Sequence, residues 1–280
     1  MDVILYNPLS KAGNNKKIAE KIVKKLNKKN IETEIVDITK IDDVNEFLTT
    51  HQKAKRFIIV GGDGTLNVLA NTIKDVNIKQ DIYLYKAGSG NDFARSLKQK
   101  GKLISIKEYF YNLPVVKFED KEKVFLNGIG LGLDGLVVYK VNQSKAKNNK
   151  ANYFKNAIIG FKEYKPNVSK VIVNNKTIDI KKTWFVAVMN DKYFGGGMKL
   201  APKASRDKNE LSLVIVKDVP KWLLFLIFPT IYLGIHTMFK RYIKIIKTNE
   251  VSITFEESQY LQIDGEDYKD IKHVNVTHSI

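Results

Sequence analysis

The stretch that decides the fold is FIIVGGDGTLNVLANTI, residues 57–73. It opens with an apolar run typical of a buried strand, passes through three glycines that flank an aspartate, and closes with apolar residues at helical spacing. A strand that enters a helix through a glycine-rich turn is typical of α/β proteins, whose ligands bind where such turns gather. We therefore expect residues 57–73 to form one strand–turn–helix unit of a parallel sheet.

The same alternation of strand and helix extends on both sides of this stretch. Strands that alternate with helices need right-handed crossovers and lie parallel in a doubly wound sheet. Residues 1–112 are therefore predicted to form a Rossmann-like α/β domain. The further strands are expected at residues 3–8, 32–38 and 81–90, and the further helices at 16–30 and 44–54.

The pattern changes after residue 112. From Leu113 onward, apolar and polar residues alternate in short segments that are separated by Gly, Asn, Asp and Lys turns. Such segments favour an antiparallel sheet or sandwich. Two stretches with helical spacing, residues 152–164 and 221–246, interrupt it. Residues 113–280 are therefore predicted to form an antiparallel β-sandwich domain with helical inserts.

The composition limits the chemistry that this chain of 280 residues can perform. It holds no cysteine, which excludes disulfides, thiolate metal sites and cysteine nucleophiles and agrees with a reducing cytoplasm. Its four histidines are scattered and form no zinc-protease motif. The N-terminus has neither the basic start nor the long apolar run of a signal peptide, so we expect a cytoplasmic protein.

The formal net charge is +17, from 47 basic and 30 acidic residues. Two explanations stay open, which are an AT-rich genome that favours lysine codons and selection for an anionic partner. Proteins that bind nucleic acid favour arginine for contacts to phosphate and guanine. Because only four of the basic residues are arginine, we expect no nucleic-acid partner, and an anionic membrane surface remains as a candidate.

One apolar segment, residues 222–239, reaches the minimum length of a membrane span. Pro229 and the polar residues Thr230, His236 and Thr237 argue against a span. Two interpretations stay open: a helix that packs on the predicted sandwich, or an interfacial helix that dips into a membrane surface beside nearby basic residues. Those basic residues are Lys240, Arg241, Lys244 and Lys247.

The glycine turn at residues 61–67 has the features of a phosphate site. Its three glycines allow the backbone to approach an anionic ligand, and the helix that follows presents free amides and its positive dipole end. Asp63 is a candidate ligand for Mg²⁺, which binds one or two carboxylates together with substrate phosphates. Thr65 and Asn67 can donate to phosphate or cap the helix. Since Asp-Gly is also a frequent plain turn, this motif alone leaves both interpretations open.

A second glycine turn, AGSGNDFAR at residues 87–95, follows the next predicted strand. Because the carboxyl ends of parallel strands meet at one edge of a sheet, both turns are expected to face one nucleotide. Neither turn fits the P-loop pattern or the complete dinucleotide pattern GxGxxG.

With these two turns, five blocks of sequence resemble the diacylglycerol kinase catalytic domain family, in particular the bacterial diacylglycerol kinase and YegS-like lipid kinases. The resemblance covers nearly the whole chain and implies a two-domain kinase. It implies nucleotide binding on the α/β domain, a β-sandwich second domain, and a cleft that binds Mg-ATP and a lipid alcohol. The blocks are Asn7-Pro8, GGDGTLN at 61–67, AGSGNDFAR at 87–95, NDKYFGGGMKLAPKAS at 190–205 and IDGE at 263–266.

The resemblance also implies roles for individual residues. It makes Glu266 the acceptor of the substrate proton, with Asp264 aiding or orienting it and Asp63 binding the metal. Taken alone, Asp-Gly-Glu after an apolar strand is equally a hairpin turn with two solvated carboxylates. The residues expected to contact the nucleotide are Asn7, Thr39, Gly61, Gly62, Asp63, Gly64, Thr65, Leu66, Asn67 and Ser89.

The sequence departs from the family pattern near residue 208. Members of the family that this chain resembles usually have a sequence close to Asp-Asp-Gly at this position and hold a structural Mg²⁺ there. This chain has Lys208 and Asn209 at the last two of these positions. Either Asp207 binds the metal with Ser205 and Glu210 nearby, or the ammonium of Lys208 takes its place.

The leading hypothesis is an ATP-dependent lipid kinase, which transfers the γ-phosphate of Mg-ATP to the hydroxyl of diacylglycerol or a related lipid alcohol. A NAD kinase-like enzyme is one alternative, because that family shares the GGDGT loop and a similar two-domain plan. A non-catalytic nucleotide- or lipid-binding protein is another. We expect peripheral contact with the inner face of the membrane, and the sequence leaves open whether the chain forms a homodimer.

Overall fold

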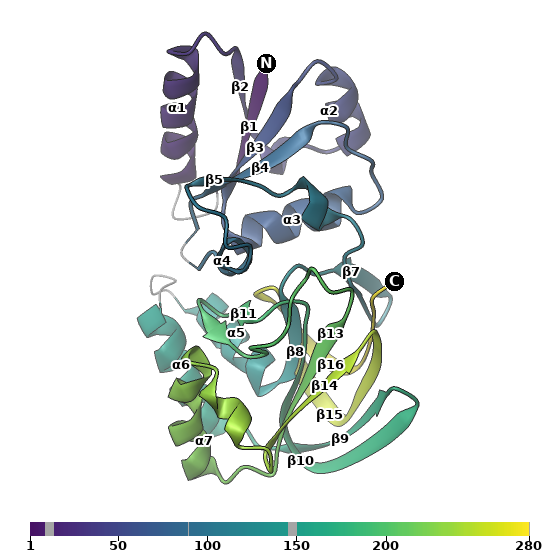
Figure 1. The fold of residues 1–280 in the computed structure, drawn as a ribbon. Helices are drawn as coiled ribbons and strands as arrows, with labels where there is room; N and C mark the ends of the chain where they lie inside the picture. Colours follow the sequence, from purple (N-terminus) through teal and green to yellow (C-terminus); the bar gives the residue numbers. More distant parts are fainter. Residues whose placement is uncertain (9–13, 89, 145–149, 280) are drawn as a thin grey trace. The chain divides into compact units, whose positions relative to one another are not determined.

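The computed structural model describes residues 1–8, 14–88, 90–144 and 150–279. These residues divide into two compact units, Met1–Tyr111 and Asn112–Ile280 (Figure 1). The first unit contains a five-stranded sheet with three α-helices of seven or more residues, and the second contains a nine-stranded sheet with helices packed on it.

The first unit is a doubly wound α/β domain with the sheet order β2-β1-β3-β4-β5. The first four strands in this order are parallel. The last strand, β5, pairs antiparallel with β4 and was not predicted from the sequence. The connection turns back here because α4 has only five residues and Gly101, with φ of 89°, follows it.

The elements of the first unit are β1 (Asp2–Tyr6), α1 (Asn14–Asn27), β2 (Thr33–Asp37), η2 (Ile38–Lys40), α2 (Val44–Thr50), β3 (Arg56–Gly61), α3 (Asp63–Ile73), β4 (Asp81–Lys86), α4 (Asp92–Ser96), β5 (Leu103–Ser105) and η3 (Lys107–Phe110).

Alternating side chains of the central strands serve the two faces of this sheet. Ile4 and Ile58 pack in one cluster with the apolar side of α1. Their neighbours Leu5 and Ile59 line a cavity together with residues of α2 and α3. Helices therefore cover both faces of the sheet, with α1 opposite α2 and α3 (Figure 1). The carboxyl ends of β1, β3 and β4 are left at one edge, where the glycine turns lie.

The second unit is built on a single antiparallel sheet that folds over itself. Its path runs β14-β13-β10-β8-β15-β16-β6-β7, and β9 pairs with both β10 and β15. The long strands β10 and β15 pair with β8 along one half and with β9 along the other. Register shifts near Thr183 and Gln259 bend these two strands, which gives the predicted sandwich-like form.

The strands of the second unit are β6 (Val115–Phe118), β7 (Lys121–Val124), β8 (Gly128–Gly132), β9 (Asn167–Val173), β10 (Lys176–Met189), β11 (Tyr193–Phe194), β12 (Met198–Lys199), β13 (Leu211–Lys217), β14 (Ile243–Thr248), β15 (Glu250–Ile263) and β16 (Glu266–Thr277). Its helices are α5 (Leu133–Gln143), α6 (Lys150–Glu163), α7 (Lys221–Ile227), η4 (Phe228–Tyr232) and η5 (Ile235–Met238).

Two apolar cores flank the sheet of the second unit. Residues of β13 alternate between them: Leu213 and Ile215 face the interior of the sandwich, whereas Val214 and Val216 face the helices. The helical layer on that outer side consists of α5, α6 and α7 (Figure 1). This layer and the sheet enclose an apolar cavity.

The predicted helical insert at residues 221–246 is wrong in its second half. The α-helix ends at Ile227, two short 3₁₀ segments follow, and Ile243 to Ile246 lie in β14. Pro229 lacks a backbone donor and Gly234 has a φ of 78°, so neither supports a continuous helix. Among the residues described, no helix is long and apolar enough to cross a bilayer.

Candidate active site

Two glycine turns meet at the carboxyl edge of the first unit's sheet, one after β3 and one after β4. The carbonyl oxygen of Gly61 accepts hydrogen bonds from the backbone N–H groups of Ala87 and Gly88, at 2.9 and 3.1 Å. The two turns predicted to face one nucleotide are therefore joined directly through their backbones.

Three glycines of these turns, Gly61, Gly62 and Gly88, stand where a Cβ atom would collide with a neighbour. A Cβ atom on Gly62 would lie 2.6 Å from the Cα of Gly88, and one on Gly88 would lie 2.5 Å from the Cα of Gly62. At Gly61 a Cβ atom would meet the side chain of Thr65 at 2.5 Å. Backbone atoms therefore form the surface of the turns at Gly62 and Gly88. At Gly64, in the first turn of α3, no atom lies within 4 Å of where a Cβ atom would be. Accessible backbone amides at the start of a helix are suited to an anionic ligand.

Asp63 links the first turn to the helix that follows the second. Its Oδ2 accepts a hydrogen bond from the N–H of Asp92 at 3.0 Å, and its Oδ1 accepts one from Phe93 at 2.8 Å. These are the first amides of α4, so Asp63 caps that helix. A carboxylate has about four acceptor positions, so two remain for a metal or for water that binds it.

Contacts within the turn explain the block GNDFAR. Asn91 has a φ of 52°, and its side chain bonds the N–H and the carbonyl oxygen of Gly88 at 3.1 and 2.8 Å. Arg95 pairs with Asp92 and donates to the carbonyl oxygen of Gly90 at 3.1 Å. These side chains hold the shape of the turn and leave its backbone to face a ligand.

The other residues expected at the nucleotide differ in their surroundings. Thr65, Leu66 and Asn67 are at most 1% exposed, so these three residues lie beneath the surface of the turn. Asn7 is partly buried just after β1. The hydroxyl and N–H of Thr39 bond Asp37 Oδ1 at 2.7 and 3.0 Å, which gives Thr39 a local capping role. Ser89 lies outside the described residues.

Asp264 and Gly265 form the two-residue turn between β15 and β16. Their φ angles are 47° and 94°, which suits the Asp-Gly pair. The Asp264 carboxylate is held by backbone groups, because it accepts hydrogen bonds from the N–H groups of Leu126, Asn127 and Gly128 at 2.5, 2.8 and 3.0 Å. Asp264 therefore anchors the loop before β8, and its carboxylate has no described contact with Glu266.

Glu266 is the first residue of β16, and two side chains hold its Oε2 atom. Lys123 Nζ donates to it at 2.7 Å, and the Tyr268 hydroxyl donates at 2.7 Å. Burial lowers the pKa of Lys123, but its interactions with Glu266 and Tyr268 outweigh this and leave the pKa above its usual value. Burial, together with the bond to Glu266, raises the pKa of Tyr268, so both donors keep their protons.

The block at residues 190–205 supports the same loop before β8. Arg206, just after it, forms a buried ion pair with Asp191 through its Nε at 3.1 Å. The guanidinium also donates to the carbonyl oxygen of Leu126 and to the side-chain oxygen of Asn127, both at 3.1 Å. Asn190 donates to that Leu126 carbonyl oxygen at 3.1 Å. These contacts fix the loop that Asp264 also binds.

The predicted structural metal region has other contacts. The Ser205 hydroxyl donates to Asp207 at 3.2 Å, and Glu210 pairs with Lys247 at 2.8 Å. Lys208 is exposed, and its N–H donates to the carbonyl oxygen of Ser205 at 3.1 Å. Within the described part of the chain, no group of three or more His, Asp or Glu side chains is arranged to hold a metal ion.

Sequence reasoning did not find Lys123 or Tyr268. Tyr268 carried a usable signal, because residues two apart on a strand share one face. Lys123 carried none, since it lies 143 residues from Glu266 in the sequence and its neighbours resemble a plain hairpin strand.

The fold and these contacts define a protein of two units, with two joined glycine turns on the first and a carboxylate held by Lys123 and Tyr268 on the second. Residues 2–113 match the diacylglycerol kinase catalytic domain, and residues 127–276 match the YegS C-terminal NAD kinase beta sandwich-like domain. The chain belongs to the YegS-like diacylglycerol kinase family, a family of lipid kinases.

Individual relatives agree with this assignment. The chain is 28% identical over 236 residues to "Putative lipid kinase YtlR" of Bacillus subtilis (strain 168), with 76% of this chain and 74% of the relative covered. It is 24% identical over 272 residues to "Diacylglycerol kinase" of the same strain, with 94% and 88% covered. A crystal structure of "a putative diacylglycerol kinase" from Bacillus anthracis str. Sterne has the same fold, with a TM-score of 0.69, 22% identity, and 99% and 94% coverage.

Proposed function

We propose that this protein is an ATP-dependent lipid kinase that transfers the γ-phosphate of Mg-ATP to the hydroxyl of diacylglycerol or a related lipid alcohol. The observation that carries the proposal is the arrangement around Glu266. Lys123 and Tyr268 both donate to Oε2, and the described contacts of Glu266 leave Oε1 available as a proton acceptor. A carboxylate that is oriented but not fully satisfied is suited to general-base catalysis.

The glycine turns of the first unit are the proposed nucleotide site. Gly62 and Gly88 leave no room for side chains, so phosphate oxygens can approach the amides at the start of α3. Asp63 would hold Mg²⁺ together with the phosphates, in the manner usual for this ion. When bound, the ion would neutralise charge on the transferred phosphoryl group. Asn7 and Thr39 are proposed to contact the rest of the nucleotide, as is Ser89.

In the proposed reaction Glu266 Oε1 accepts the proton of the lipid hydroxyl while the hydroxyl oxygen attacks the γ-phosphorus. The bond between the γ-phosphorus and the oxygen that bridges it to the β-phosphate breaks, and ADP leaves. Lys123 and Tyr268 are positioning residues, because they hold the carboxylate and do not themselves take the proton. Asp264 is also proposed to be a positioning residue, because its bonds to backbone amides fix the turn that precedes Glu266.

We also propose that the segment from α7 to η5 contacts an anionic membrane. Its side chains Trp222, Leu226, Leu233 and Met238 are between 63% and 75% exposed, which is unusual for residues of this kind. Exposed cationic residues flank them at Lys221, Lys240 and Arg241. Apolar side chains that insert beside lysine and arginine are typical of interfacial membrane binding.

The direct test incubates the purified protein with Mg²⁺ and γ-labelled ATP, and with either dioctanoylglycerol in mixed micelles or NAD. We expect the label in the lipid product. Label in the NAD product would instead favour the NAD kinase-like alternative. Binding of ATP without transfer to any lipid alcohol in a bacterial lipid extract would favour a non-catalytic binding protein.

A further inference from the structure

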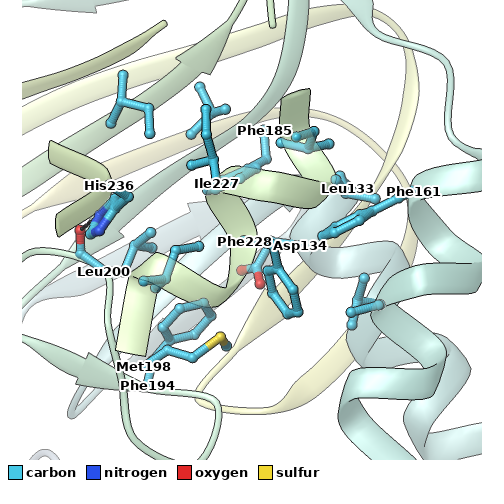
Figure 2. Close-up of a pocket in the computed structure, with 16 residues that line it drawn as sticks. Leu133, Asp134, Phe161, Phe185, Phe194, Met198, Leu200, Ile227, Phe228 and His236 are labelled. Atoms are coloured by element: carbon cyan, nitrogen blue, oxygen red, sulfur yellow. Dashed lines mark hydrogen bonds between the residues drawn. The ribbon is translucent and has the colours of Figure 1, made fainter. Parts of the chain in front are cut away.

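A cavity in the second unit lies between the sheet and the layer formed by α5, α6, α7 and the 3₁₀ segments (Figure 2). Its walls are almost entirely apolar, and aromatic side chains such as Phe161, Phe185 and Phe228 form much of them. Its volume of about 50 Å³ accommodates roughly four groups of the size of water or methylene. The space therefore suits a short segment of hydrocarbon chain.

One carboxyl group interrupts this apolar wall. Asp134, in the first turn of α5, is 6% exposed, and Figure 2 shows its oxygens among the apolar side chains. Burial raises its pKa to about 7, although the hydrogen bond from Gln262 acts in the opposite direction. Much of the population is therefore neutral near pH 7, and a neutral carboxyl group has an O–H to donate.

The orientation of the Gln262 side-chain amide decides which oxygen of Asp134 accepts a hydrogen bond and which one is left to carry the proton. The N–H of Gly265 can only donate, and it lies 3.0 Å from Gln262 Oε1. The amide NH₂ of Gln262 therefore points to Asp134 and donates to Oδ2 at 2.9 Å. Because Oδ2 already accepts this bond, the proton of the neutral carboxyl group belongs on Oδ1. No described hydrogen bond uses Oδ1.

An O–H group in an apolar wall that lacks a partner is costly, so this site is suited to a ligand that supplies an acceptor. The acceptor has to be uncharged, since an anion would lose its hydration in these apolar surroundings. It also has to be attached to hydrocarbon that fills the space beside it. An acyl chain joined to its carbonyl group meets all three requirements.

We propose that the cavity binds an acyl chain of the lipid substrate and that Asp134 Oδ1–H donates a hydrogen bond to the acyl carbonyl oxygen. The inference rests on the proposed function, since it assigns the lipid of that reaction to this cavity. Gln262 connects the contact to Gly265, the residue before Glu266, so lipid binding and the catalytic turn share one hydrogen-bonded chain. Asp134 would thus select acyl lipids over alkyl lipids.

The test compares 1,2-dioctanoylglycerol with its ether analogue 1,2-dioctylglycerol, which has no carbonyl groups. Affinities of the full-length protein are measured by calorimetry, which does not depend on catalysis. We expect the wild type to bind the ester about tenfold more tightly than the ether. Asp134→Leu should remove this preference by weakening ester binding. Asp134→Asn should keep it, because an amide accepts from Gln262 with its oxygen and donates to the ligand with its nitrogen.

Controls separate this contact from other features of the cavity. Met198→Leu changes the apolar lining without changing a hydrogen bond, so it should keep the ester preference. His236 also lines the cavity, and its Nδ1 has no partner among the residues described, so His236→Leu tests the other polar group. If Asp134→Leu fails to fold by circular dichroism, Asp134→Ala provides the same comparison with a smaller side chain.

Several results would overturn the inference: wild-type protein that binds neither lipid or both equally, an ester preference that survives Asp134→Leu, or loss of that preference in His236→Leu instead. The kinase assay on the same samples distinguishes failure of the acyl-chain inference from failure of the proposed kinase function. Selective ester binding that depends on Asp134, without phosphorylation, would support the cavity and contradict the kinase. Phosphorylation of the lipid at the same rate by wild type and by Asp134→Leu, without an ester preference, would support the kinase and contradict the proposed role of the cavity.

Discussion

Asp134→Asn is predicted to stabilise the second unit at high pH. The pKa of Asp134 rises from 3.8 to about 7 on folding because the carboxyl group is buried. The folded state therefore binds more protons than the unfolded state between these values, and stability falls as the pH rises through this window. Each unit of pKa is worth about 1.4 kcal/mol, so the full loss is about 4 kcal/mol, of which about 2.5 kcal/mol falls between pH 5 and pH 8.

Asparagine has the same shape and no charge to bury, so the variant should lack this loss. The assay is urea unfolding at pH 5, 6, 7 and 8, followed by tryptophan fluorescence. Both tryptophans, Trp184 and Trp222, lie in the second unit, so the signal reports on that unit alone. The stability difference between variant and wild type should grow by about 2.5 kcal/mol from pH 5 to pH 8.

The exposed residue Asp120 supplies the control, and Asp120→Asn should show no such growth. A difference between Asp134→Asn and wild type that stays constant from pH 5 to pH 8 would refute the reasoning. It would mean that the carboxyl group ionises in the folded protein at no cost, and hence that the cavity wall is not dry.

Three further predictions follow from other contacts. Gly88→Ala places a Cβ atom 2.5 Å from the Cα of Gly62, so it should destabilise the first unit by about 2 kcal/mol or more and weaken ATP binding, as measured by calorimetry and unfolding. Lys123→Met should lower kcat by about tenfold to a hundredfold while the KM for ATP stays unchanged, and Lys123→Arg should recover part of the loss. Replacing both Trp222 and Met238 with Ser should reduce co-sedimentation with anionic vesicles at low salt by more than fivefold, and equal sedimentation would contradict the membrane proposal.

Local sequence signals predicted the first unit well. The strand at β3, the glycine turn and α3 lie within 18 consecutive residues, and their periodicities agree with one another. The antiparallel edge strand β5 was missed because it depends on how a short loop after α4 turns back. That outcome is decided by backbone geometry at Gly101, which apolar periodicity does not record.

The second unit depends more on contacts between distant residues. Helix α5 was not predicted, because LDGLVVYKVNQ contains a glycine and several β-branched valines that disfavour a helix. It forms because Leu133 and Val137 pack into the core beneath α6 and α7. Conversely, Ile243 to Ile246 continue an apolar segment but pair with β13 as a strand.

In the candidate site, too, local motifs were predicted from the sequence, whereas contacts between distant residues were not. The glycine turns and Glu266 were identified from motifs, but the contacts of Asp63 and Asp264 with backbone amides were not. Those contacts join residues 29 and 137 positions apart, and a motif does not show which partner a carboxylate finds. Lys123 and Asp134 became candidates only when the sheet placed them beside Glu266 and Gln262.

The central claim is that Glu266 accepts the proton of a lipid hydroxyl, and single-turnover kinetics of Glu266→Gln tests it most directly. The exposed residue Glu256 provides a matched control in the Glu256→Gln variant. We expect Glu266→Gln to slow phosphoryl transfer to dioctanoylglycerol by about a hundredfold or more, with ATP affinity within about twofold of wild type. Transfer at the wild-type rate by Glu266→Gln would contradict it.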